Sequence, residues 1–562
     1  MTLRERGFSF LRLRRAGRDQ ASSGALVAGA VSDDAATTTA DQSEAAGSSK
    51  PPRTPNRPPH DPRHLRLVPP DEPRRFTPKP LGHAERGPLR RVALAVPDAR
   101  HHSHVIGATG SGKSTLLVNL ILADARAGRG VVVLDPKGDL VTDVLARLPE
   151  SAGRRLVLVD PAETIAPPSL NVLDTKGRDP DLVADQVTEV FHRLYAAFWG
   201  PRTEDVLRSA CLTLARRPGT TLAHVPLLLQ NAQYRKSVTA HLADTEGLGG
   251  FWSWYEQLSD AAQANVVGPV LNKLRAVLTR RFTADLFGST SSTFSLAEVL
   301  DGGILLCRLP KGVIGEDTTR LVGSLLLASL WQAATRRAEL PESRRLDAAV
   351  YVDECQNFLH LPGSLDDVLA EARGYRLALT LAHQHLGQLP REMSETVAAN
   401  ARNKVFFTVS PDDARVLARH VGPYLTAEDL AHLDRYQAAC RLVVDGRDTH
   451  GFTIATEPPP PITNDHTASL RAAARARGRS QTERERDRLA RRYAGGEIDR
   501  AKANRSERRA DGAFGPADGD VAVPDGAALA PDGTGAADGD QPDVPDDTDE
   551  ATERDNSAGG VA

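Results

Sequence analysis

Short runs of consecutive apolar residues, each ending at a carboxylate or a turn, recur between residues 92 and 456. Such runs are typical of strands that are buried on both faces of a parallel sheet. Stretches with helical periodicity separate them, and this alternation favours a doubly wound sheet whose ligand lies at the carboxyl ends of the strands. The pattern predicts strands at 92–96, 131–135, 156–160, 304–309, 348–354, 377–381, 405–409 and 441–444.

The periodicity changes between about residues 181 and 286. Apolar residues there recur three and four positions apart, and no strand-like run interrupts them. We therefore expect an all-α segment inserted into the α/β fold. Its Trp252, Trp254 and Tyr255 would stack on nucleic-acid bases if exposed, but small helical segments more often use such side chains in their core.

One loop between an apolar run and a helical stretch fits the pattern G-x-x-x-x-G-K-[ST] without a mismatch. Its glycines would let backbone N–H groups close around phosphate oxygens, and the N-terminus of the next helix favours negative charge. The alternative is an ordinary glycine-rich turn, which would not require a strand before it and a helix after it. Lys113 is expected to contact the β- and γ-phosphates of ATP, and Ser114 to bind Mg²⁺. The predicted nucleotide-binding residues are Gly107, Ala108, Thr109, Gly110, Ser111, Gly112, Lys113, Ser114 and Thr115.

ATP hydrolysis also requires a second protein ligand for the metal and a carboxylate that orients the attacking water. Asp353 closes an apolar run and suits the metal, and Glu354 suits the water. The alternative is an ordinary acidic strand end. Gln384 follows the next expected strand and would sense the γ-phosphate, whereas Arg373 precedes that strand and would act as an arginine finger on a neighbouring subunit. By spacing alone, a polar strand end and a surface Arg are the simpler interpretations.

The net charge of −3 conceals an asymmetry. Residues 511–562 contain 14 acids and one Arg, so the rest of the chain carries about +10, which suits a polyanionic partner. The acidic tail would compete with DNA for basic surface, or would only aid solubility. The four cysteines have no metal-binding spacing and indicate a reducing compartment. The basic segment 1–20 is expected to be a disordered arm, with contact to a membrane surface as the alternative.

These observations define six expected parts, with the folded core ending near Thr456. The parts are a disordered basic, Pro-rich arm (1–78), the first part of a P-loop ATPase domain (79–180), an all-α inserted domain (181–290), the second part of the ATPase domain (291–456), a charged, partly helical linker (457–510) and an acidic disordered tail (511–562).

Several segments together resemble the type IV secretion coupling proteins of the TraG/TraD type, which are conjugative DNA-transfer ATPases. The similarity covers roughly residues 80–456. The segments are the loop 107–115, Asp135-Pro136-Lys137-Gly138-Asp139, residues 352–358 (VDECQNF) and residues 382–389 (AHQHLGQL), with the tracts 199–202 (WGPR) and 268–273 (GPVLNK) in support.

The resemblance implies a RecA-like nucleotide domain with an inserted all-α domain, ATP and Mg²⁺ as cofactors, and a homohexameric ring. It also implies that the ring moves DNA, free or relaxase-bound, toward type IV secretion channel proteins. In this family pattern Lys113 and Ser114 match the nucleotide loop, Asp353 and Glu354 the metal-and-base pair, Arg373 the intersubunit finger and Gln384 the sensor glutamine.

Members of this family carry N-terminal transmembrane helices, but this sequence contains no run of 18 apolar residues. The chain is therefore expected to be cytoplasmic or peripheral at the inner face of the membrane. Two alternatives stay open. One is a soluble DNA-processing motor related to HerA and FtsK, without a secretion role. The other is an ATP-dependent switch or scaffold that does not translocate.

Overall fold

The structure is a computed structural model that describes residues 76–85, 90–242 and 244–494 of the chain. The predicted N-terminal arm, apart from residues 76–78, and the predicted acidic tail lie outside these residues. None of the described helices is long and apolar enough to cross a lipid bilayer.

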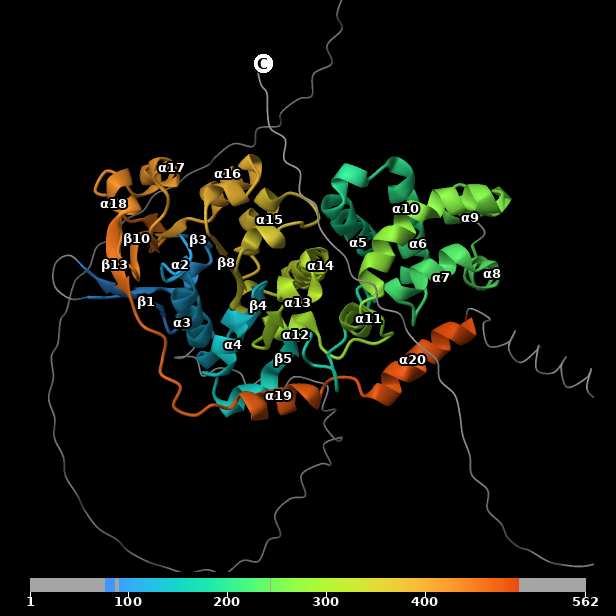
Figure 1. Cartoon of the computed structure of the whole chain (residues 1–562), viewed down its shortest axis with the longest axis horizontal. Coiled ribbons are helices and arrows are strands. Elements are labelled where there is room, and N and C mark those ends of the chain that lie inside the picture. Colours follow the sequence, from blue (N-terminus) through green and yellow to red (C-terminus); the bar gives the residue numbers. More distant parts are fainter. Residues whose placement is uncertain (1–75, 86–89, 243, 495–562) are drawn as a thin grey trace, which may run out of the picture. The chain divides into compact units, whose positions relative to one another are not determined.

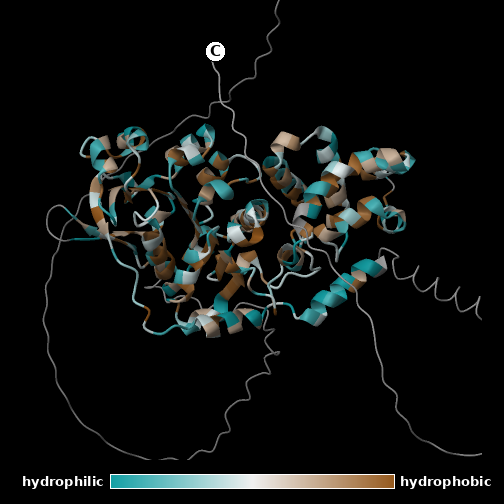
Figure 2. Cartoon of the chain, viewed as in Figure 1, coloured by the Kyte–Doolittle hydropathy of each residue, from teal (hydrophilic) through white to brown (hydrophobic). Residues whose placement is uncertain are grey.

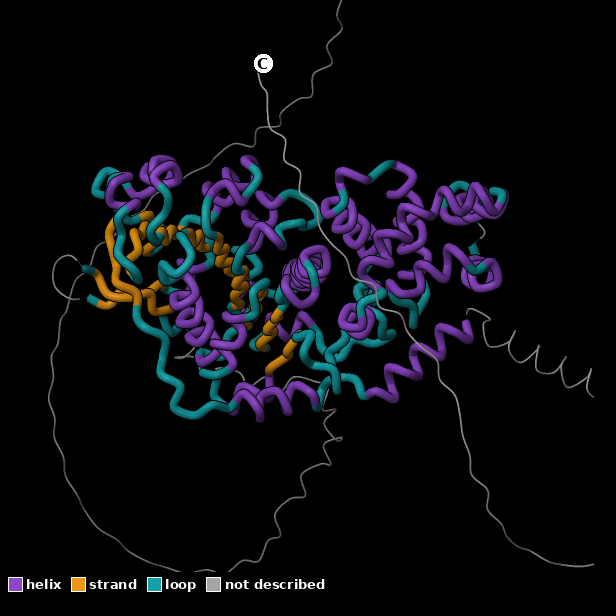
Figure 3. Tube along the Cα trace, in the orientation of Figure 1, coloured by secondary structure: helices purple, strands orange, loops and turns teal. Residues whose placement is uncertain are grey.

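Eleven strands of the described residues form one sheet, in the order β2-β1-β13-β10-β9-β3-β8-β7-β4-β6-β5 (Figures 1 and 3). The strands from β9 to β5 in this order are parallel, and those from β10 to β2 are antiparallel. The strands are β1 (Lys79–Ala84), β2 (Arg91–Leu94), β3 (Ser103–Ile106), β4 (Gly130–Asp135), β5 (Leu156–Val159), β6 (Ile304–Arg308), β7 (Ala348–Val352), β8 (Leu377–His383), β9 (Asn403–Phe406), β10 (Gln437–Arg441) and β13 (Phe452–Thr456), and β11 (Val443–Val444) pairs separately with β12 (Arg447–Asp448).

The central strands are buried on both faces, as their continuous apolar runs predict. Every residue of β4 and β7 is buried. Because successive side chains of a strand point to opposite faces, Val132 joins one hydrophobic cluster while Val131 and Val133 join another. Figure 2 shows the apolar residues concentrated in these strands and the helices packed on them.

Helices cover the sheet and also fill the segment between β5 and β6, where the described residues contain no strand (Figure 3). The predicted fold class, an α/β P-loop sheet with an all-α insertion, is confirmed. The helices are α2 (Val96–Ala99), α3 (Lys113–Arg126), α4 (Asp139–Leu145), α5 (Pro180–Leu194), α6 (Pro201–Ala215), α7 (Val225–Gln230), α8 (Ala232–Thr239), α9 (Leu248–Gln257), α10 (Asp260–Leu278), α11 (Arg281–Phe287), α12 (Leu296–Leu300), α13 (Lys311–Ile314), α14 (Glu316–Thr335), α15 (Leu365–Ala372), α16 (Arg391–Asn400), α17 (Pro411–Val421), α18 (Ala427–Ala431), α19 (Thr467–Arg475) and α20 (Gln481–Ala494).

Aromatic residues of α9 serve the core of the helical segment. Trp252 and Tyr255 are buried, and their polar atoms donate to Thr213 Oγ1 (2.9 Å) and to the Leu229 carbonyl (2.8 Å). Trp254 is 41% exposed. Of the three aromatic residues considered for base stacking, two are therefore core residues.

The folded body extends beyond its predicted end at Thr456. Leu470 of α19 is fully buried in the hydrophobic cluster that includes Val131 and Val133 of β4. The helix α19 lies against β5 (Figure 1). Ion pairs join Arg471 to Asp160 (2.8 Å) and Arg484 to Asp285 (2.7 Å). The sequence pattern missed this packing because one buried Leu among arginines and alanines gives almost no apolar periodicity.

Candidate active site

The loop between β3 and α3 has the backbone of a phosphate-binding loop. Gly110 and Gly112 have φ of 80° and 124°, in the region that favours glycine. A Cβ on Gly107 would lie 2.5 Å from the Phe407 Cβ, so this position has no room for a side chain. The loop glycines are thus required by conformation and by close approach, and α3 begins directly at Lys113.

Two polar residues of the loop, Ser111 and Lys113, are buried, and their side chains have few hydrogen-bond partners among the described residues. Lys113 Nζ donates to the carbonyls of Gly107 and Ala108, the latter at 3.1 Å, and burial lowers the pKa of Lys113. Ser111 Oγ is buried, and it lacks a hydrogen-bond partner within the described part of the chain. Ser114, the second residue of α3, is exposed at the mouth of the loop.

Two carboxylates stand at the carboxyl ends of β4 and β7, which are neighbours in the sheet. Asp135 ends β4 and accepts backbone N–H groups of Lys137 (2.9 Å), Gly138 (2.7 Å) and Val141 (2.9 Å), so it fixes the turn into α4. Asp353 follows β7 and is buried. Burial, followed by the charges of Glu354 and Asp135, raises the pKa of Asp353 to about 7.

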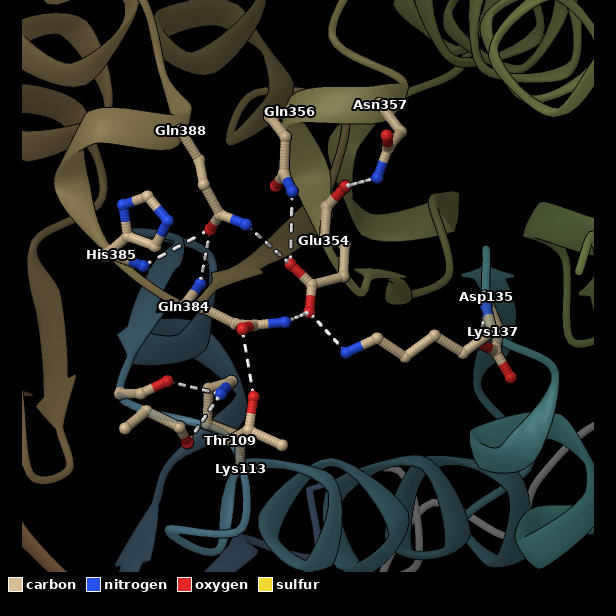
Figure 4. Close-up of polar contacts among 12 residues, drawn as sticks. Thr109, Lys113, Asp135, Lys137, Glu354, Gln356, Asn357, Gln384, His385 and Gln388 are labelled. Atoms are coloured by element: carbon tan, nitrogen blue, oxygen red, sulfur yellow. Dashed lines mark hydrogen bonds and ion pairs between the residues drawn. The ribbon is translucent and has the colours of Figure 1, made fainter. Parts of the chain in front are cut away.

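Glu354 has a strained backbone at the end of β7. Its φ of 47° and ψ of 56° are left-handed, which is uncommon for a residue other than glycine and is enriched at functional sites. The Asn357 side-chain amide donates to the Glu354 carbonyl at 2.7 Å and the Asn357 backbone N–H to the same oxygen at 3.0 Å. These bonds hold the conformation that turns the carboxylate toward the loop (Figure 4).

Four side chains donate hydrogen bonds to the Glu354 carboxylate (Figure 4). Burial alone would raise the pKa of Glu354, but the donors outweigh it, Gln384 first and then Lys137 and Gln356, and the pKa falls to about 2. The carboxylate is therefore ionised at neutral pH. The donors are Gln384 Nε2, Lys137 Nζ (2.6 Å), Gln356 Nε2 (3.1 Å) and Gln388 Nε2 (3.4 Å).

Gln384 connects the phosphate-binding loop to Glu354. It follows β8, which pairs with both β3 and β7. Its side-chain oxygen accepts from Thr109 Oγ1 at 3.0 Å while its nitrogen donates to Glu354. Its backbone N–H donates to Gln388 Oε1 at 2.7 Å. A conformational change of the phosphate-binding loop can therefore be passed to the Glu354 carboxylate through the side chain of Gln384.

Arg373 lies apart from these residues within the same chain. It is an exposed residue at the carboxyl end of α15, before the first residue of β8, whereas Gln384 follows the last. The seven residues of β8 separate the two ends by about 20 Å, given a rise of roughly 3.3 Å per residue. The chain thus brings Lys113, Asp353, Glu354 and Gln384 to one sheet edge and leaves Arg373 at the other.

Three residues that hold Glu354 received no role from the sequence pattern: Lys137, Gln356 and Gln388. Lys137 had a usable signal, since it stands in the turn after a buried strand, where charged side chains gather in a parallel sheet. Gln356 and Gln388 had none, because polar residues after a strand are common.

The residues present fit a nucleoside triphosphate with Mg²⁺. The loop provides glycine backbone, an inward-facing lysine ammonium and a buried hydroxyl with unused hydrogen-bonding capacity. Ser114 and Asp353 supply the hydroxyl and carboxylate oxygens that Mg²⁺ prefers beside phosphate. Lys113 and Ser114 would hold phosphate and metal, and the metal would neutralise charge on the phosphates.

Fold and site together define a P-loop nucleotide-binding protein with an inserted helical segment. Residues 89–435, more than half of the chain, match the family model described as "Type IV secretion-system coupling protein DNA-binding domain". The chain belongs to this family, and the resemblance inferred from its motifs is confirmed. No curated protein matches the chain.

Several solved structures are similar to this one. The unbound bacterial conjugative coupling protein TrwBdeltaN70 is 16% identical, with a TM-score of 0.47, covering 66% of this chain and 89% of that one. TrwB in complex with ADP and Mg²⁺ is 17% identical, with a TM-score of 0.47 and coverage of 65% and 88%. VirB4 of Thermoanaerobacter pseudethanolicus is 16% identical, with a TM-score of 0.43 and coverage of 69% and 97%.

Proposed function

We propose that this chain is an ATPase of the type IV coupling-protein kind that moves DNA, free or relaxase-bound, during conjugative transfer. The observation that carries the proposal is the placement of Glu354. This ionised carboxylate lies at the end of β7, and one glutamine joins it to the phosphate-binding loop. A protein that only binds a nucleotide has no need for a positioned base.

The residues take separate roles in this proposal. Lys113 and the loop backbone bind the phosphates, while Ser114 and Asp353 hold Mg²⁺. Glu354 orients a water for attack and accepts its proton, and Gln384 reports the state of the loop to Glu354. Burial raises the pKa of Asp353, and this carboxylate would be ionised when it holds the metal.

Arg373 acts across a subunit boundary in this proposal. Its side chain is too far along the sheet to reach the loop of its own chain, but it is exposed and available to the site of a neighbour. An arginine supplied by a neighbour neutralises charge that develops on the transferred phosphoryl group. We therefore propose a homohexameric ring with sites between subunits.

DNA is the proposed substrate because the chain belongs to a family whose model describes a DNA-binding domain. Outside residues 511–562 the chain also carries a net charge of about +10, which suits phosphate contacts. The proposed place of action is the cytoplasm or the inner face of the membrane, where DNA and secretion channel proteins would both be reached.

The test is the ATPase rate of the purified chain with no DNA, with single-stranded DNA and with double-stranded DNA. A DNA-coupled motor is expected to hydrolyse ATP faster when at least one of the two is present. Glu354→Gln should bind ATP and lose turnover in every condition. An ATPase rate that neither DNA changes would contradict translocation and would favour a nucleotide switch.

A further inference from the structure

Tyr436 is an exposed aromatic residue that the chain holds beside the phosphate-binding loop. It precedes β10, which runs antiparallel to β9, so it arrives at the sheet edge where β3 ends in the loop. Its backbone N–H donates to the Ser111 carbonyl at 2.8 Å. Its carbonyl accepts from Thr456 N (2.8 Å) and Thr456 Oγ1 (3.0 Å). The position of Tyr436 relative to the loop is therefore fixed from both sides.

The left-handed backbone of Tyr436 costs free energy, and burial of the ring in the core does not explain it. Its φ of 71° is left-handed, a genuine outlier for a bulky residue, and Gly or Asn would adopt it with less strain. Tyr436 is 38% exposed, so the core does not require a ring at this position. Strain of this kind persists where the surroundings impose it, and it clusters at ligand sites.

The ring of Tyr436 lies against the last loop glycine. A Cβ on Gly112 would approach the Tyr436 Cδ1 to 3.1 Å and the Phe407 Cε1 to 3.0 Å, so two aromatic rings lie close to Gly112. The next residue is Lys113, the predicted phosphate ligand. In a nucleotide only the ribose separates phosphates from base, so a planar surface beside Gly112 is within reach of a base.

Arg435 stacks over one face of the Tyr436 ring and supports it. Its guanidinium carbon lies 4.7 Å from the centroid of the Tyr436 ring, and both side chains are exposed. Tyrosine rings and arginine planes are the groups on which nucleobases stack, and stacking tolerates different bases because every base has a π-face.

We propose that Tyr436, supported by Arg435, forms the stacking platform for the base of the bound nucleotide. This subsite rests on the proposed nucleotide-binding function. It contacts the base of the nucleotide, whereas the loop contacts the phosphates. Tyr436 is thus a binding residue that makes the site prefer a nucleotide over a bare polyphosphate.

Equilibrium binding to the full chain, measured by calorimetry with Mg²⁺, tests the subsite without relying on turnover. The ligands are ATP and inorganic tripolyphosphate, which shares the phosphates and lacks the base. Tyr436→Asn removes the ring and tolerates the left-handed backbone, and Tyr436→Phe keeps the ring. Tyr424→Asn is the matched control, since Tyr424 is 62% exposed and contacts His450 away from the loop.

Tyr436→Asn is expected to weaken ATP binding by about 5- to 150-fold, as for one lost base–aromatic stack, and to leave tripolyphosphate binding unchanged. Tyr436→Phe and Tyr424→Asn should bind both ligands like the wild type. ATP affinity unchanged in Tyr436→Asn would overturn the subsite, as would an equal loss for both ligands, which would assign Tyr436 to loop structure. Wild-type protein that binds neither ligand would overturn the nucleotide site itself.

Discussion

The ion pair between Lys137 and Glu354 makes a quantitative prediction. The two charged atoms lie 2.6 Å apart, with the Glu354 side chain 5% exposed and the Lys137 side chain 49% exposed. Breaking a fully buried pair costs about 3–5 kcal/mol, and a surface pair contributes about 0–1 kcal/mol. With one partner half exposed and three amides still donating to Glu354, we expect a coupling free energy of about 1–2 kcal/mol.

The assay is a double-mutant cycle of Lys137→Met and Glu354→Gln, with chemical unfolding of ligand-free protein at pH 7 in a chelator. Each single variant should be destabilised, and the double variant should lose about 1–2 kcal/mol less than the sum. The control cycle uses Lys311 and Glu316, whose charged atoms lie 3.8 Å apart and whose side chains are 36% and 54% exposed, so neither charge is buried. A coupling at Lys137 no larger than at this control would refute the view that Lys137 holds the carboxylate.

The remaining predictions address the site, the subunit boundary, the core and α19. Lys113→Ala should weaken ATP binding and turnover together, whereas Glu354→Gln should lower turnover about 100-fold or more and preserve binding, as measured by calorimetry and phosphate release. Arg373→Ala should be inactive alone and partly recover when mixed with Glu354→Gln protein; no recovery at any ratio would contradict a role in trans. Burial and then the charge of Arg441 lower the pKa of Lys404 to about 7. Below pH 7 the folded protein must therefore hold a buried charge on Lys404, which lowers the free energy of unfolding. This destabilisation disappears as the pH rises from 7 toward 10.5, the ordinary pKa of Lys. Lys404→Met should therefore be more stable than the wild type at pH 6.5 by a few kcal/mol, about 3–4, and the difference should shrink by about 1.4 kcal/mol per pH unit above pH 7, measured by unfolding. Leu470→Ala should lower stability by about 2–5 kcal/mol if α19 is part of the fold, and an unchanged unfolding midpoint would place α19 outside it.

Apolar runs predicted the central sheet well because those strands are buried on both faces, so each run is continuous. The antiparallel strands β1 and β13 escaped prediction, since β1 contains Pro80 and Gly82 and both strands mix polar with apolar residues. The position of Glu354 could be predicted because a strand end is visible in the sequence. The donors that lower its pKa could not, because they come from three separate segments and meet only in the folded sheet.

Arg373 shows a different limit of prediction. The chain places Arg373 at the opposite end of β8 from Gln384, and its proposed role as a finger would require a neighbouring subunit. The family pattern supplies the finger role, and the structure supplies the reason why that role cannot be played within one chain.

The central claim is that ATP hydrolysis at Glu354 drives movement along DNA, and displacement of a triplex-forming strand from duplex DNA tests it most directly. Wild-type protein should release the labelled third strand with ATP and Mg²⁺, and not with a non-hydrolysable analogue. Glu354→Gln, still bound to ATP and DNA, should release none. The third strand is placed at one end of the duplex in one substrate and at the other end in a second. Hydrolysis of ATP by the wild type without release of the third strand from either substrate would contradict the account.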